Sequence, residues 1–157
     1  MSTDPRAWDA GAPGVVTLPD GRTVRGRGVR RGAVEAGDEP DLGAYLLGRA
    51  PSVAWPSVWI AWPDLRLPRD PAAAVATLVR VHAAAAEERV EVACAGGIGR
   101  TGTALAILTR LSGVPAADAV AWVRARYHPR AVETPRQRRF AETVALPDAG
   151  SSDAGDA

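Results

Sequence analysis

A cysteine and an arginine enclose a glycine-rich segment that could bind an anion. Cys94 and Arg100 are separated by the five residues Ala95-Gly96-Gly97-Ile98-Gly99, and Thr101 follows directly. Glycines allow this segment, here called the cysteine loop (residues 94–100), to curl so that successive backbone N–H groups point inward. A thiolate at the bottom of such a ring is a nucleophile, and a guanidinium can bind two phosphate oxygens at once. The pattern therefore indicates nucleophilic attack on phosphate or a similar anion.

Cleavage of a phosphate ester also needs a proton for the leaving oxygen, and a carboxylic acid is a suitable donor. Trp62-Pro63-Asp64 follows a predicted strand and opens a proline-bearing segment, here called the aspartate loop (residues 62–69). Asp70 is the rival acid. It precedes Pro71, however, and this pair is typical of the N-cap and first position of a helix. We therefore expect Asp64 to be the general acid.

The spacing of Cys94, Arg100 and Thr101, together with the Trp-Pro-Asp tripeptide, resembles the two catalytic loops of the cysteine-dependent protein-tyrosine phosphatase superfamily. The glycine-rich cysteine loop looks closest to the compact dual-specificity group, particularly kinase-associated phosphatases. The resemblance covers about residues 15–144 and implies one α/β domain with a central, mostly parallel sheet flanked by helices. It also implies a phosphomonoester hydrolase: a protein tyrosine or dual-specificity phosphatase that forms a phosphocysteine on a phosphorylated protein substrate.

The same resemblance implies a role for each residue of the two loops. Cys94 would attack phosphorus, Arg100 would bind the phosphate oxygens and Asp64 would protonate the leaving group. Thr101 would hydrogen-bond the sulfur and ease its departure in the second step. The loop backbone would bind the substrate phosphate, or a phosphate or sulfate ion, through Ala95, Gly96, Gly97, Ile98 and Gly99. Neither a metal ion nor another cofactor is implied.

Two further positions bear on this interpretation. Gln137, in Glu133-Thr134-Pro135-Arg136-Gln137, resembles the glutamine that positions water in some relatives, whereas an exposed helical glutamine is the alternative reading. Relatives commonly carry a histidine directly before the nucleophile, where this chain has Ala93. The thiolate of Cys94 would lack the support of that imidazole.

Three other functions compete with this one. Residues 97–102 fit the G-x-G-x-x-G pattern of dinucleotide sites, and Asp118 has roughly the spacing of the acidic residue such a site needs, but it falls in a predicted helix. A phosphate-binding module of the same fold without catalysis would also keep the cysteine loop. Sulfur transfer through a cysteine persulfide would leave Asp64 without a task, and is disfavoured.

The elements that position these loops follow from hydrophobic periodicity and from turn residues. Val15–Leu18 and Thr23–Arg27 predict a β-hairpin around Pro19-Asp20-Gly21, and residues 41–47 could form one short helix. Further predictions are a buried strand over 58–61, a helix from Pro71, a strand over 90–93, and helices over 100–111, 116–127 and 135–144. Ligands of parallel sheets bind at the carboxyl ends of the strands, so both loops should lie at one edge.

Composition limits the remaining choices. The chain has 157 residues, of which 46% are hydrophobic and 24% charged, as suits one globular domain. Its net charge of +1 makes nucleic acid or an anionic membrane an unexpected partner. A single cysteine excludes an intrachain disulfide. We expect a flexible arm at 1–14, the phosphatase domain at 15–145, a disordered tail at 146–157, and a cytoplasmic protein because no targeting segment is evident.

Overall fold

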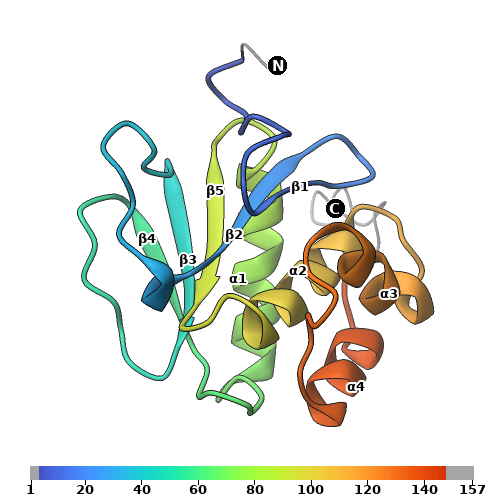
Figure 1. The fold of residues 1–157 in the computed structure, drawn as a ribbon. Helices are drawn as coiled ribbons and strands as arrows, with labels where there is room; N and C mark the ends of the chain where they lie inside the picture. The colour runs from blue at the N-terminus through green and yellow to red at the C-terminus, as the bar shows by residue number, and fades with distance from the viewer. Residues whose placement is uncertain (1–3, 148–157) are drawn as a thin grey trace, which may run out of the picture.

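The computed structural model describes residues 4–147, which contain a five-stranded sheet (Figure 1). In the order β1-β2-β5-β3-β4, its strands are Val15–Thr17, Thr23–Gly28, Val90–Cys94, Leu42–Leu47 and Ser57–Ala61. Only the β1–β2 pair is antiparallel, whereas the β2–β5, β5–β3 and β3–β4 pairs are parallel. The predicted α/β fold with a mostly parallel sheet is confirmed.

Four α-helices flank this sheet: α1 (Pro71–Ala84), α2 (Gly99–Leu111), α3 (Ala116–Arg126) and α4 (Pro135–Thr143). A short 3₁₀ helix, η1 (Val29–Arg31), follows β2. Helices α1 and α2 contact each other and the same sheet, and α3 and α4 pack on α2, so these helices cover one face. Alternate strand residues point to that face and join the helices in one apolar core, as Val90 and Val92 of β5 do.

The sequence signals for helix starts are confirmed at both proline sites. Oδ1 of Asp70 accepts a hydrogen bond from the Ala73 N–H at 3.1 Å, with Pro71 as the first residue of α1. Thr134 caps α4 in the same way by accepting from the Gln137 N–H at 3.1 Å. A side-chain oxygen here satisfies a backbone donor that has no partner within the helix. Asp70 therefore has a structural role as a cap.

The predicted hairpin at β1 and β2 is confirmed, but the short helix predicted at 41–47 is wrong. That segment is β3, a central strand bonded to β5 on one side and to β4 on the other. Its run of apolar residues lacks the alternation of a half-buried strand. Pairing on both sides decides its conformation, because tertiary context overrides weak local preference.

The strand predicted at 58–61 exists as β4, but its description as buried is wrong in part. β4 lies at the edge of the sheet, and only Ile60 of its residues is buried. Trp59 points away from the helices, and 45% of its surface is exposed. Its indole N–H donates to the Leu47 carbonyl at 2.9 Å, which anchors one end of the ring.

Residues 4–14, most of the segment predicted as a flexible arm, include one deeply packed side chain. Trp8 is buried, and its indole N–H donates to the Val90 carbonyl at 2.7 Å. The guanidinium of Arg25 lies 4.1 Å from the centre of the Trp8 ring, in a cation–π contact. The backbone N–H of Trp8 donates to the hydroxyl of Thr23 at 3.0 Å, so the segment packs where β2 and β5 begin. The predicted tail lies outside the described residues from 148 onward, and no described helix is long and apolar enough to cross a membrane.

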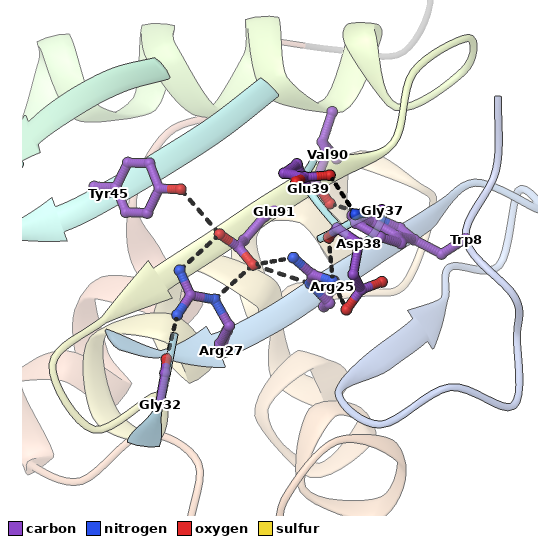
Figure 2. A network of polar contacts seen from close by, with 10 residues as sticks. All are labelled: Trp8, Arg25, Arg27, Gly32, Gly37, Asp38, Glu39, Tyr45, Val90 and Glu91. Atoms are coloured by element: carbon purple, nitrogen blue, oxygen red, sulfur yellow. Dashed lines mark hydrogen bonds and ion pairs between the residues drawn. The ribbon is translucent and has the colours of Figure 1, made fainter. Parts of the chain in front are cut away.

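A buried carboxylate joins three strands on the sheet face opposite the helices (Figure 2). Oε1 of Glu91, on β5, accepts from Arg25 at 2.7 Å and from Arg27 at 2.8 Å, both of β2. Its Oε2 accepts from the hydroxyl of Tyr45, on β3, at 2.9 Å. Burial alone would raise the pKa of Glu91, but the two arginines outweigh it and the pKa is lowered. Glu91 therefore ties its two neighbouring strands together as an anion.

Replacing Glu91 with glutamine is expected to lower the free energy of unfolding by about 3 kcal/mol near pH 7, because it leaves two arginines without their counter-charge. The pKa of Glu91 lies below its ordinary value of 4.5, so the advantage of the wild type is full above about pH 4.5 and declines at lower pH. Urea unfolding across this pH range measures both effects. The exposed Glu88→Gln is the matched control, and an equal cost in the two variants would contradict the prediction.

Candidate active site

The two loops singled out in the sequence meet at the carboxyl edge of the sheet. The cysteine loop connects β5 to α2, and the aspartate loop follows β4 and leads to α1 (Figure 1). Arg100 joins them: its NH1 donates to the Trp62 carbonyl at 2.9 Å, and its NH2 lies 3.5 Å from Oδ1 of Asp64. Residues far apart in the sequence thus form one site.

The sulfur of Cys94 lies at the bottom of the cysteine loop and accepts two hydrogen bonds. The backbone N–H of Gly97 donates to Sγ at 3.2 Å, and the hydroxyl of Thr101 donates at 3.0 Å. Both donors point at the sulfur, and a hydrogen bond to a charged acceptor is stronger than one to a neutral group. Thr101 therefore has the contact with sulfur that its predicted role requires.

Arg100 is the buried cation of the site, with only 4% of its surface exposed. NH1 and NH2 contact the aspartate loop, whereas Nε is buried and has no hydrogen-bond partner among the described residues. A buried, charged donor without a partner is costly unless a ligand accepts from it. The guanidinium can therefore contribute a donor to an anion in the cysteine loop.

The aspartate loop is anchored at one end and exposed at the other. Trp62 is fully buried, and its indole N–H donates to the Arg66 carbonyl at 2.6 Å. Its ring lies edge-on to Phe140 of α4, with 6.0 Å between ring centres. The Asp64 side chain is 65% exposed. The carboxylate of Asp64 is thus accessible to a bound substrate beside Arg100.

Gln137 is buried, so the reading of this residue as an exposed helical glutamine is wrong. Its Oε1 accepts from the Glu133 N–H at 3.0 Å and from the Thr134 N–H at 3.3 Å, which completes the capping box of α4. Its Nε2 donates to the Arg66 carbonyl at 3.4 Å and so reaches the aspartate loop. Its position is compatible with a role near the site, and water positioning stays a prediction.

Arginine side chains surround the exposed part of the aspartate loop. A surface cavity of about 770 Å³ is lined by Asp64 and by three arginines, Arg66, Arg69 and Arg136. These side chains come from the loop itself and from the first turn of α4. The entrance beside Asp64 is therefore basic.

The cysteine loop packs closely on β2, a contact that the sequence analysis missed. A Cβ on Gly28 would lie 2.6 Å from the carbonyl carbon and oxygen of Gly96, so only glycine fits there. Gly97 has φ +75°, in the left-handed region that favours glycine, and it packs on the Gly28 backbone. The alternation of glycine and arginine along Arg25-Gly26-Arg27-Gly28 was the one available signal.

The protein-tyrosine phosphatase family model matches residues 48–145, which include both loops and more than half of the chain. The chain belongs to the protein-tyrosine phosphatase family. The crystal structure of Tk-PTP in the active form has a TM-score of 0.65 and 23% identity, covering 82% of this chain and 93% of Tk-PTP. A mutant form of Tk-PTP gives 0.64 at 23% identity, with 78% and 89% covered. These two structures share the fold.

A curated relative, an uncharacterized protein of Methanocaldococcus jannaschii, is 46% identical over 54 residues. The match covers 34% of this chain and 33% of that protein, so the chain matches only about a third of the relative's length. The dinucleotide alternative is wrong for this member of the family. A dinucleotide site needs a further strand after α2, and among residues 4–147 only α3 and α4 follow, with Asp118 in the first turn of α3.

Gly28→Ala tests the contact between β2 and the cysteine loop. Gly28 has φ −101° and ψ 120°, which alanine adopts without strain, so any loss must come from the new methyl group. We expect the free energy of unfolding to fall by about 2 kcal/mol because the methyl overpacks the contact with Gly96. Urea unfolding measures this change. In Gly48→Ala the new Cβ would meet nothing nearer than 4.0 Å, and a similar loss in that control would contradict the explanation.

Proposed function

We propose that this member of the protein-tyrosine phosphatase family is a phosphomonoester hydrolase acting through a phosphocysteine at Cys94. One observation carries the proposal: a sulfur that accepts hydrogen bonds from Gly97 and Thr101 lies in the same loop as an arginine whose buried Nε has no partner among the described residues. A nucleophile and a phosphate-binding cation thus share one loop. The donors to sulfur support a thiolate, and the guanidinium suits the equatorial oxygens of a phosphoryl group.

In the first step, the Cys94 thiolate attacks phosphorus and an S–P bond forms while the ester P–O bond breaks. Arg100 and the inward N–H groups of the cysteine loop bind the phosphoryl oxygens as charge develops on them. Asp64, in its protonated form, gives its proton to the leaving oxygen. Its side chain is exposed and lies 3.5 Å from Arg100, which supports this role for a phosphate bound beside Arg100.

In the second step, water attacks phosphorus and the S–P bond breaks, which releases inorganic phosphate. The Asp64 carboxylate accepts the proton of the water, and the thiolate of Cys94 re-forms. The Thr101 hydroxyl, 3.0 Å from the sulfur, stabilises the departing thiolate. Gln137 is proposed to help position this water. These steps use side chains and water alone, so we expect turnover to continue in EDTA.

The basic entrance supports a phosphoprotein as the substrate. Arg66, Arg69 and Arg136 line the cavity beside Asp64 and could attract acidic residues that flank a phosphorylated side chain. The five residues between Cys94 and Arg100 are alanine, glycine and isoleucine, and none of them adds a positive charge for a polyphosphorylated ligand. Both tyrosine and dual specificity fit this proposal, and a kinetic panel of phosphotyrosine, phosphoserine and phosphothreonine peptides distinguishes them.

A phosphate-binding module of the same fold is the second candidate, and Ala93 is the observation that favours it. This buried residue gives the sheet end of the cysteine loop no polar side chain. The presence of Asp64 and Thr101 at the site favours the enzyme instead, because a module needs neither a proton donor nor a leaving-sulfur donor.

Cys94→Ser is expected to abolish phosphate release from p-nitrophenyl phosphate, since a serine hydroxyl is a far weaker nucleophile at this position. Thr101→Ser should retain most of the turnover because it keeps the hydroxyl. Thr101→Val should lower kcat about 10-fold, which corresponds to the loss of one charge-assisted hydrogen bond. Undiminished hydrolysis by Cys94→Ser would disprove the proposed nucleophile.

Asp64→Ala separates the enzyme from the binding module. An enzyme that has lost its general acid should turn over roughly 10²- to 10⁴-fold more slowly and still bind phosphopeptide. In a binding module, the substitution should change neither phosphopeptide binding nor phosphate release. Phosphopeptide binding and phosphate release are measured on the same samples. Asp70→Ala is the matched control: it should reduce stability through loss of the α1 cap and leave kcat near that of the wild type.

A further inference from the structure

We infer that Arg31 and Tyr127 are positioning residues that aim two backbone N–H groups of the cysteine loop at the phosphate. Neither side chain is near the sulfur by sequence, and both contact the loop from outside. The Arg31 Nε donates to the Gly96 carbonyl at 2.8 Å, and the Tyr127 hydroxyl donates to the Gly97 carbonyl at 2.6 Å. The inference rests on the proposed phosphate chemistry.

Peptide geometry turns these outer contacts into control of the inner surface. In a planar trans peptide, the C=O of one residue and the N–H of the next point in opposite directions. Fixing the Gly96 carbonyl outward therefore fixes the Gly97 N–H inward, and this N–H indeed donates to Sγ of Cys94 at 3.2 Å. By the same geometry, the bond from Tyr127 to the Gly97 carbonyl turns the N–H of Ile98 into the loop.

These peptides need outside support because their own residues supply little. Gly96 and Gly97 have no side chains, and glycine loses more conformational freedom on ordering than any other residue. A Cβ on Gly96 would meet nothing within 4 Å, so on that side no neighbour holds the residue, and its packing is limited to the contact of its carbonyl with Gly28. Ala93, at the strand end, offers no polar group. A loop of this composition can present inward N–H groups reliably only if its carbonyls are held.

Tyr127 is well suited to this task. Its ring packs on Gly26 of β2, where a Cβ would lie 2.5 Å from the ring, and so its position is fixed by close contact. Burial, with a smaller contribution from the charge of Cys94, raises the pKa of Tyr127 well above its usual range. The hydroxyl consequently remains a donor throughout the pH range in which the protein would work.

Arg31 is the more exposed partner of the pair. Arg31 is the last residue of η1, which directly follows β2. The side chains of Arg31 and Tyr127 both line a cavity of about 490 Å³ on the outer side of the cysteine loop. An exposed hydrogen bond contributes less than a buried one because water competes for both groups. We therefore expect Tyr127 to have the larger effect on anion binding.

Tyr127→Phe keeps the ring on Gly26 and removes only the donor. We expect the inhibition constant of inorganic phosphate to rise about 10-fold, and kcat/KM for p-nitrophenyl phosphate to fall by about the same factor. Arg31→Met should raise the inhibition constant about 3-fold. Tyr45→Phe is the matched control, because it removes a buried tyrosine hydroxyl bond on the other face of the sheet, to Glu91, at 2.9 Å.

Urea unfolding of each variant separates positioning from folding. Partial unfolding lowers the amount of active protein and therefore kcat, but it leaves KM and the inhibition constant of phosphate unchanged. Provided that the wild type is active, two results would overturn the inference. One is an unchanged inhibition constant of phosphate in Tyr127→Phe, and the other is a rise of this constant in Tyr45→Phe equal to that in Tyr127→Phe. If the wild type itself neither hydrolyses p-nitrophenyl phosphate nor is protected by phosphate against urea, the proposed function fails first.

Discussion

The rest of the site depends on one constraint, the close approach of two backbones. The backbone of β2 at Gly28 meets that of the cysteine loop at Gly96 and Gly97. No side chain fits between them, since a Cβ on either Gly28 or Gly97 would lie within 3 Å of the opposite backbone. The loop can thus curl tightly around the sulfur and α2 can begin at Gly99. The same glycines that permit this approach leave the loop without side chains of its own. Its order must come from neighbouring elements, which explains why donors from η1 and from the end of α3 contact its outer carbonyls.

The buried ionic network on the opposite face of the sheet serves the same contact. Glu91 lies three positions before Cys94 on β5 and bonds Arg25 and Arg27, which alternate with the glycines of β2. One face of β2 therefore has no side chains at Gly26 and Gly28, and the other carries the long, charged side chains of Arg25 and Arg27. A shift of β2 by one residue would exchange the two faces, bury arginines against the cysteine loop and separate them from Glu91. A buried ion pair contributes little net stability, but it strongly disfavours such an alternative register.

Local signals predicted the site better than they predicted its support. The spacing from Cys94 to Thr101 and the Asp70 and Thr134 caps are properties of neighbouring residues, and the structure has them where the sequence placed them. The strand nature of β3, the burial of Trp8 and the contact of Tyr127 with Gly97 depend on partners distant in the chain. Gln137 combines both cases: its capping box is local, whereas its contact with Arg66 is not. Periodicity and spacing carry no information on partners distant in the chain, so these features could not have been derived from the sequence.

The site divides into a fixed, buried side at Arg100 and an exposed side at Asp64. Arg100 is buried and bonded to the Trp62 carbonyl, and Trp62 is itself held by Arg66 and Phe140. By contrast, Asp64 is mostly exposed, its contact with Arg100 spans 3.5 Å, and Leu65 next to it has φ +62°, a conformation unfavourable for a side chain of this kind. An ion pair of this length with a mostly exposed carboxylate contributes little to folding, so stability does not explain the carboxylate or the strained residue beside it. Their placement next to Arg100, the cation proposed to bind phosphate, is explained if the loop serves proton transfer, since that task requires a carboxylate that reaches the substrate without being fixed to the protein.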